Sequence, residues 1–140
     1  DGISPTRLAM HKKSDELAAA SDFEEFSRQV IAAAKWDGNS QLVIDGIRHV
    51  EALSAVCKIV SPIPLVLIYI DIDKTVQINR FKARDGLTEN DLREYEGHQT
   101  ELAVATALRQ AANFIVDGNG PIDHVLDQVM IHVVGQITPQ

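Results

Sequence analysis

The most informative run of this chain is Leu65-Val-Leu-Ile-Tyr-Ile-Asp71. It is apolar from end to end until the closing aspartate, and Ser61-Pro62-Ile63-Pro64 separates it from the residues before it. Such a run is typical of a strand buried on both faces of a parallel sheet. Residues 41–45 and 114–117 form two shorter runs that also end in an aspartate. We therefore expect three strands.

Helical patterns alternate with these strands. The expected helices, in chain order, cover residues 4–20, 21–31, 48–60, 75–84, 102–112 and 122–133. Ser21 and Glu24 form a capping box at the second of them. Strands that alternate with helices indicate a single α/β domain over residues 1–140, in which helices flank a parallel sheet in three layers.

Composition narrows the classes of function. The 140 residues carry 20 acidic and 13 basic side chains, a net charge of −7, which argues against nucleic acid or an anionic membrane as the main partner. No apolar run approaches the roughly 18–20 residues of a membrane span. The lone Cys57 excludes internal disulfides and is typical of a cytoplasmic protein. Because the chain begins at Asp1, we expect a processed, cut or designed segment.

The first candidate site is the turn Asp45-Gly46-Ile47-Arg48, directly after the first expected strand. Ligands of open parallel sheets bind beyond the carboxyl ends of the strands, and all three expected strands end in an acid there. Asp45 could hold a magnesium ion through water, and Arg48 could bind a phosphate or carboxylate. The alternative is an ordinary strand-end turn whose acid initiates a helix.

The second candidate is a pair of arginines, Arg80 and Arg84, which share one face of the expected helix. They precede residues 87–101, a charge-rich segment that we expect to be a mobile helical excursion. Cations at the base of such a segment suit phosphoryl transfer, where they meet the charge on the transferred group. The alternative is a solvated helix face.

The third candidate is Gly97-His98-Gln99-Thr100-Glu101, which closes the excursion. Glu101 could accept hydrogen bonds from a base or sugar, and His98 could titrate near neutral pH. The alternative is that His98 or Thr100 caps the helix that follows.

Taken together in this order, the segments resemble the middle of P-loop nucleoside and nucleotide kinases. The resemblance is greatest to small bacterial kinase-like ATPases near dephospho-CoA kinase and the nucleoside monophosphate kinases. It spans nearly the whole chain. The segments that carry it are 42–51, 65–71, Arg80 with Arg84, 98–101 and 112–119.

The resemblance implies ATP and magnesium as cofactors and a small nucleotide as partner. Asp45 would lie near the metal and the acceptor, and Arg48 would bind the acceptor. Arg80 and Arg84 would act on the transferred phosphoryl group, with residues 85–101 as the lid that closes over it. His98 and Glu101 would contact the substrate. Asp117 and Asn119, in the turn that runs to Gly120, would lie beside the adenine.

The sequence departs from that family at one place. It contains no Gly-x-x-x-x-Gly-Lys-Ser/Thr loop, which supplies the backbone amides, lysine and hydroxyl that hold the phosphates and magnesium. In the family this loop follows a first strand that lies between the strands expected here at 41–45 and 65–71. Three explanations stay open. The chain is the C-terminal portion of a longer kinase, those two strands pair directly, or another chain supplies the upstream portion.

We therefore expect a portion of an ATP-dependent kinase that has no activity as this chain alone. One alternative is a non-catalytic interaction or regulatory module on the same scaffold, formed as an oligomer. The other is a binding domain for an anionic small molecule, held by Arg48, Arg80 and Arg84.

Overall fold

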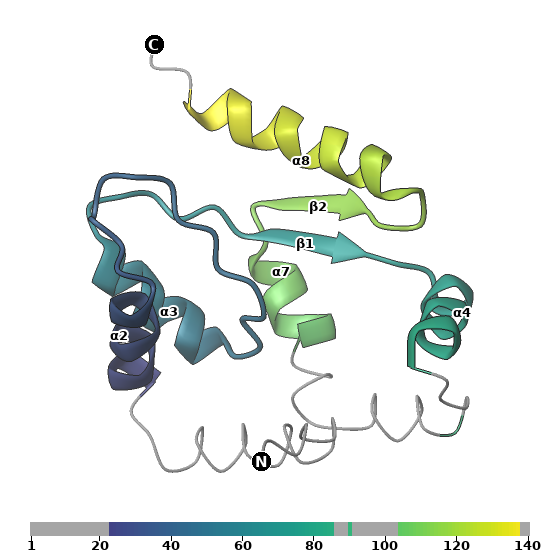
Figure 1. Ribbon diagram of the computed structural model, residues 1–140, viewed down its shortest axis with the longest axis horizontal. Helices are drawn as coiled ribbons and strands as arrows, with labels where there is room; N and C mark the ends of the chain where they lie inside the picture. Colours follow the sequence, from purple (N-terminus) through teal and green to yellow (C-terminus); the bar gives the residue numbers. More distant parts are fainter. Residues whose placement is uncertain (1–22, 86–89, 91–103, 138–140) are drawn as a thin grey trace. The chain divides into compact units, whose positions relative to one another are not determined.

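A computed structural model describes residues 23–85, 90 and 104–137 of the chain (Figure 1). The expected helix at 4–20 and most of the excursion at 87–101 lie outside these residues. The chain divides into two compact units, Asp1–Leu65 and Val66–Gln140, and each is described separately below. Within the described ranges, no helix is long and apolar enough to cross a membrane.

The first unit contains two helices that pack against each other, α2 (Phe23–Ala33) and α3 (Val50–Val60). Both were predicted from apolar spacing, and both are confirmed. Glu24 and Glu25 lie in the first turn of α2, where they complement the positive end of the helix dipole. The buried side chains of α3 are Leu53, Ala55, Val56 and Val60.

The predicted strand at 41–45 is wrong. Residues 41–49 form no regular structure, and the Val43 side chain is 91% exposed. A strand persists only when its backbone groups are paired in a ladder, and the structure gives this segment no ladder partner among the described residues. The β-branched residues there prefer an extended backbone, but a strand also needs a neighbouring strand to pair with.

The second unit is built on a parallel pair of strands, β1 (Ile68–Asp71) and β2 (Phe114–Asp117). Asn113 starts the pair, because its side-chain oxygen accepts a 2.7 Å hydrogen bond from the Leu67 amide. Its own amide donates to the Leu67 carbonyl at 2.9 Å. Two of the three predicted strands and their parallel direction are confirmed, whereas a three-layer sheet is not seen in the described residues.

The prediction that β1 is buried on both faces is wrong. Ile70 is 55% exposed, and Ile115 on the neighbouring strand is 46% exposed. The part of the sheet that the structure describes has two strands, and so small a sheet has few neighbouring elements to cover both faces. The buried apolar side chains of this unit come instead from several elements: Phe81, Leu108, Val116 and Val125.

Helices complete the second unit. α4 (Lys74–Asp85) follows β1, and α8 (Ile122–Ile137) follows β2 and packs against it (Figure 1). His132 of α8 stacks on Phe114 of β2, with ring centroids 4.2 Å apart. Where one α-helix was predicted over 102–112, the described part is a π-helical turn, η1 (Val104–Leu108), followed by the short α7 (Arg109–Ala111).

Candidate functional site

The carboxyl ends of β1 and β2 meet at one edge of the sheet. Asp71 and Asp117 are register partners at the last position of the pair. Their side chains leave the sheet on the same face, since partners in a parallel pair point the same way. The sequence predicted an acid at the end of each of these strands, and the structure confirms that two of them lie together.

The turn after β2, residues 117–120, is held by its own polar groups. The Asp117 carboxylate accepts hydrogen bonds from the backbone amide of Asn119 at 2.9 Å and from its side-chain amide at 2.8 Å. The side-chain oxygen of Asn119 in turn accepts a 2.7 Å bond from the backbone amide of Asp73. Asn119 therefore ties the turn after β2 to the segment after β1.

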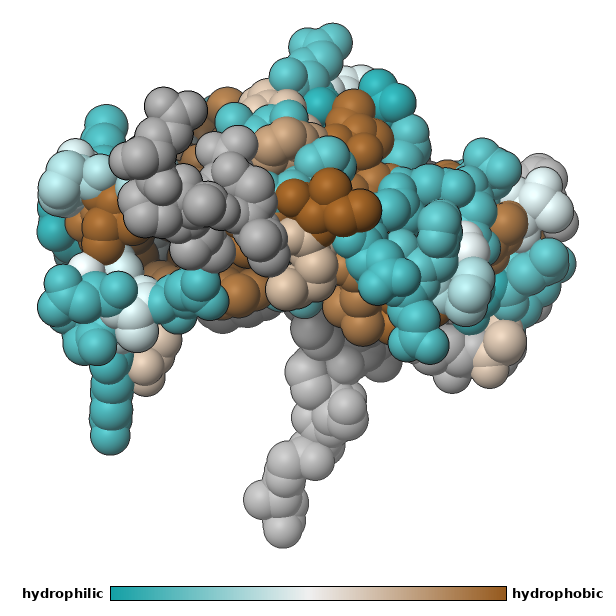
Figure 2. Space-filling view, turned by 90° about the horizontal axis from the view of Figure 1, so that it is seen from above, coloured by the Kyte–Doolittle hydropathy of each residue, from teal (hydrophilic) through white to brown (hydrophobic). Residues whose placement is uncertain are grey.

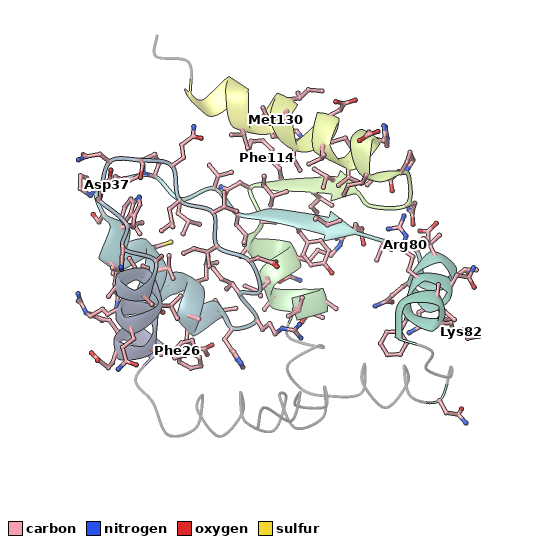
Figure 3. All side chains as sticks on the ribbon, viewed as in Figure 1. Phe26, Asp37, Arg80, Lys82, Phe114 and Met130 are labelled. Atoms are coloured by element: carbon pink, nitrogen blue, oxygen red, sulfur yellow. The ribbon has the colours of Figure 1, made fainter. Side chains whose placement is uncertain are left out.

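Arg80 reaches this turn from α4 (Figure 3). Its Nη1 donates to the carbonyl of Gly118 at 2.8 Å. Its Nη2 donates to the carbonyls of Asn119 at 3.1 Å and Gly120 at 2.9 Å. One guanidinium thus binds three successive carbonyls, which places Arg80 at the predicted nucleotide turn.

Gly118 allows the two strand ends to approach each other. Its amide donates a 2.7 Å hydrogen bond to the Asp71 carbonyl. A Cβ at this position would lie 2.7 Å from Cγ2 of Ile70 and 2.9 Å from the same carbonyl, closer than non-bonded atoms approach. The absence of a side chain is therefore required for the turn to close on β1.

Gln128 of α8 fixes the other side of Asp117. Its side-chain oxygen accepts from the Asp117 amide at 2.8 Å, and its side-chain nitrogen donates to the Asp117 carbonyl at 2.9 Å. A glutamine that satisfies both backbone groups of one residue acts as a substitute for a third strand at that point.

Arg109 of α7 supplies the counter-charge to Asp71. Its Nη2 lies 2.9 Å from Oδ2 of Asp71, and both side chains are nearly half exposed. The hydrogen bond from Arg109 to this carboxylate, with its negative charge, raises the pKa of the guanidinium above its ordinary value. The edge thus carries a water-exposed ion pair beside a fixed turn, an arrangement suited to binding a polar ligand.

The predicted residues Asp45 and Arg48 belong to the first unit. Asp45 is exposed and Arg48 is half-buried, and neither follows a strand as predicted. Gly46 between them has a φ of +84°, a backbone conformation that favours glycine. Among the described residues, no group of three or more His, Cys, Asp and Glu side chains could hold a metal ion.

Other predicted residues fall elsewhere. The side chain of Arg84, together with His98 and Glu101, lies outside the described residues. The structure adds Asp73, Arg109 and Gln128 to the site. No local sequence pattern marks them. Arg109, for example, pairs with a residue 38 positions earlier in the sequence.

Comparisons with protein-family models, with curated proteins and with solved structures each found no match to this chain.

Proposed function

We propose that this chain is a portion of an ATP-dependent, kinase-like protein that transfers a phosphoryl group to a small nucleotide-like or phosphorylated acceptor. The base of the nucleotide would contact the turn 117–120, and Asp45 would lie near the magnesium ion, as the resemblance implies. Arg48 would bind the acceptor, Arg84 the transferred group, and His98 and Glu101 the substrate. The chain alone would have no activity.

The observation that carries this proposal is the in-register ending of β1 and β2 at Asp71 and Asp117. Parallel sheets bind their ligands at this edge. The turn beyond it is held by Asn119 and Gln128 before any ligand arrives. A turn fixed in advance loses little conformational entropy on binding, which favours recognition of a small rigid group such as a base.

The expected inactivity follows from the sequence. A phosphate loop stabilises the charge on the nucleotide phosphates during transfer, and these 140 residues contain no such motif. Without it, the phosphates of ATP contribute little to binding. Recognition by this chain would rest on the nucleoside part.

Two measurements on the purified chain test the proposal. In equilibrium dialysis, we expect adenosine and ATP with magnesium to bind weakly and with similar affinity, because both offer the same base. In a phosphoryl-transfer assay, we expect no ADP above the protein-free blank. Binding of ATP without binding of adenosine would overturn the assignment of the turn to the base, and turnover would overturn the inactivity.

A second candidate is a non-catalytic interaction module on the same scaffold, and one surface favours it. Ile122, Leu126 and Met130 repeat every four residues along α8 and are each at least half exposed. Figure 2 looks onto the side of the second unit that carries α8, and brown, hydrophobic side chains reach the surface there. Exposed apolar stripes are typical of interaction surfaces. Sedimentation of the chain and of Leu126→Lys tests it, since an oligomer that uses this stripe dissociates in the variant.

A further inference from the structure

We propose that Arg80 is a positioning residue that sets the backbone of residues 118–120 from within the protein. This inference rests on the proposed function in one respect: it takes that turn as the part of the chain that meets the ligand. The resemblance implied contact between Arg80 and the transferred phosphoryl group. The hydrogen bonds of its guanidinium assign it to the turn instead.

The geometry joins two elements that are distant in sequence. Arg80 lies in the middle of α4, and the carbonyls it binds follow 38, 39 and 40 positions later. Three adjacent carbonyls converge on one cation, and their partial negative charges would repel one another without it. Removing the guanidinium therefore leaves these three carbonyls without the cation on which they converge.

Arginine is suited to this task in a way that lysine is not. The guanidinium is planar and presents several N–H donors in a rigid fork, whereas an ammonium is a compact point charge on a flexible stem. In Arg80 the two terminal nitrogens divide the three carbonyls between them. Hydrogen bonds that involve a charged group are also stronger than those between neutral groups.

Asn119, Gln128 and Arg80 bind different groups of the turn. Asn119 binds Asp117 and Asp73, and Gln128 binds the backbone of Asp117. These bonds, with that from the Gly118 amide to the Asp71 carbonyl, engage the backbone amides of residues 117–119 and the side chain of Asn119. The carbonyls of Gly118, Asn119 and Gly120 take their side-chain hydrogen bonds from Arg80. The effect of removing Arg80 should therefore be confined to residues 118–120.

The first test uses the unliganded chain and needs no nucleotide. In Arg80→Ala we expect amide hydrogen exchange at Gly118 and Asn119, whose amides donate to Asp71 and Asp117, to rise about tenfold or more, because a loss of about 1.4 kcal/mol is a factor of ten. Millimolar guanidinium should restore slow exchange by occupying the vacated position, and Arg80→Lys should restore it only in part. Arg28→Ala is the matched control, because Arg28 pairs with Glu24, four positions earlier on an exposed face of α2. Unchanged exchange in Arg80→Ala would overturn the proposal.

A second measurement stands if Arg80→Ala does not fold. In the unmodified chain, the Arg80 Nη nitrogens should give separate nuclear magnetic resonance signals, because bonds to three carbonyls stop the guanidinium from rotating. The exposed Arg28 should give one averaged signal. An averaged signal from Arg80 would overturn its positioning role.

Ligand binding separates this inference from the proposed function. If the unmodified chain binds adenosine, Arg80→Ala should bind it about tenfold more weakly, and guanidinium should restore the affinity. Equal binding with an unchanged turn would overturn the role of Arg80 and leave the proposed function standing. Failure of the unmodified chain to bind adenosine would overturn the proposed function, and the exchange result would still decide the role of Arg80.

Discussion

Asp71 and Asp117 end the two parallel strands as register partners, yet their carboxylates bind different groups. Asp71 pairs with the guanidinium of Arg109, whereas Asp117 accepts hydrogen bonds from the backbone and side-chain amides of Asn119. Two carboxylates side by side repel each other, and such partners offset this repulsion. The Asp71–Arg109 ion pair is therefore partly exposed to water, whereas the Asp117 carboxylate stabilises the turn.

The ion pair between Asp71 and Arg109 should contribute little to stability. Both side chains are nearly half exposed, so water and salt screen their attraction. A double-mutant cycle of Asp71→Asn and Arg109→Ala, followed by urea unfolding, should give a coupling free energy of about 0.2–1 kcal/mol that shrinks with added salt. A coupling well above this range would mean that the pair is shielded from solvent.

Gly118→Ala should destabilise the second unit. The added Cβ would meet Cγ2 of Ile70 and the carbonyl of Asp71 at less than 3 Å, so the turn must move. We expect the free energy of unfolding to fall by about 1–3 kcal/mol. Gly120→Ala is the control, because its Cβ would lie 3.1 Å from the His124 ring, which can rotate away. An equal loss in both variants would argue against the close approach at Gly118.

Val116→Ala should cost more stability than Ile115→Ala, although it removes fewer atoms. Val116 is 1% exposed, whereas Ile115 is 46% exposed. The buried cavity left by Val116→Ala should lower the free energy of unfolding by about 2 kcal/mol. Urea unfolding compares the two, and the reverse order would contradict the orientation of β2.

The turn at residues 37–40 should lose stability in acid. The Asp37 carboxylate accepts hydrogen bonds from the Ser40 amide at 2.8 Å, the Asn39 amide at 2.9 Å and the Ser40 hydroxyl at 2.7 Å. These bonds, with that from the Ser40 amide the largest cause, lower the pKa of Asp37 from 3.8 to about 2. Because the folded pKa is lowered, the stabilisation is complete above pH 3.8 and disappears as the pH falls through about 2.

A carboxyl titration by nuclear magnetic resonance measures the pKa of Asp37 directly. Ser40→Ala removes the hydroxyl donor and keeps both amide donors, so the pKa should rise but stay below 3.8. An unchanged pKa in this variant would show that the hydroxyl bond is absent in solution.

The sequence predicted most elements because their signals are local. Apolar spacing located α2, α3 and α8, and the runs ending in Asp71 and Asp117 located both strands. The strand expected at 41–45 failed because β-branched residues record a preference, whereas a strand also needs a partner. The exposure of Ile70 and Ile115 could not be foreseen for the same reason, since burial depends on the number of neighbouring strands.

The candidate site was predicted in part. Asp117 was named as the acid that ends a strand, and Asn119 was named from the family resemblance; the structure places both in a hydrogen-bonded turn at the sheet edge. Arg80 was named from its spacing to Arg84, but helical spacing reports only which face a side chain shares. Its bonds to residues 118–120 span about forty positions and depend on the tertiary fold. Arg109 lacked any local signal.

A chemical-shift titration of the unliganded chain with adenosine tests whether the edge formed by β1 and β2 binds a nucleotide base. We expect the amide signals of Gly118, Asn119 and Gly120 to move together as adenosine is added, and those of α2 and α3 to stay unchanged. Shifts confined to residues outside the turn and the adjoining strand ends, or no shifts at millimolar adenosine, would contradict it.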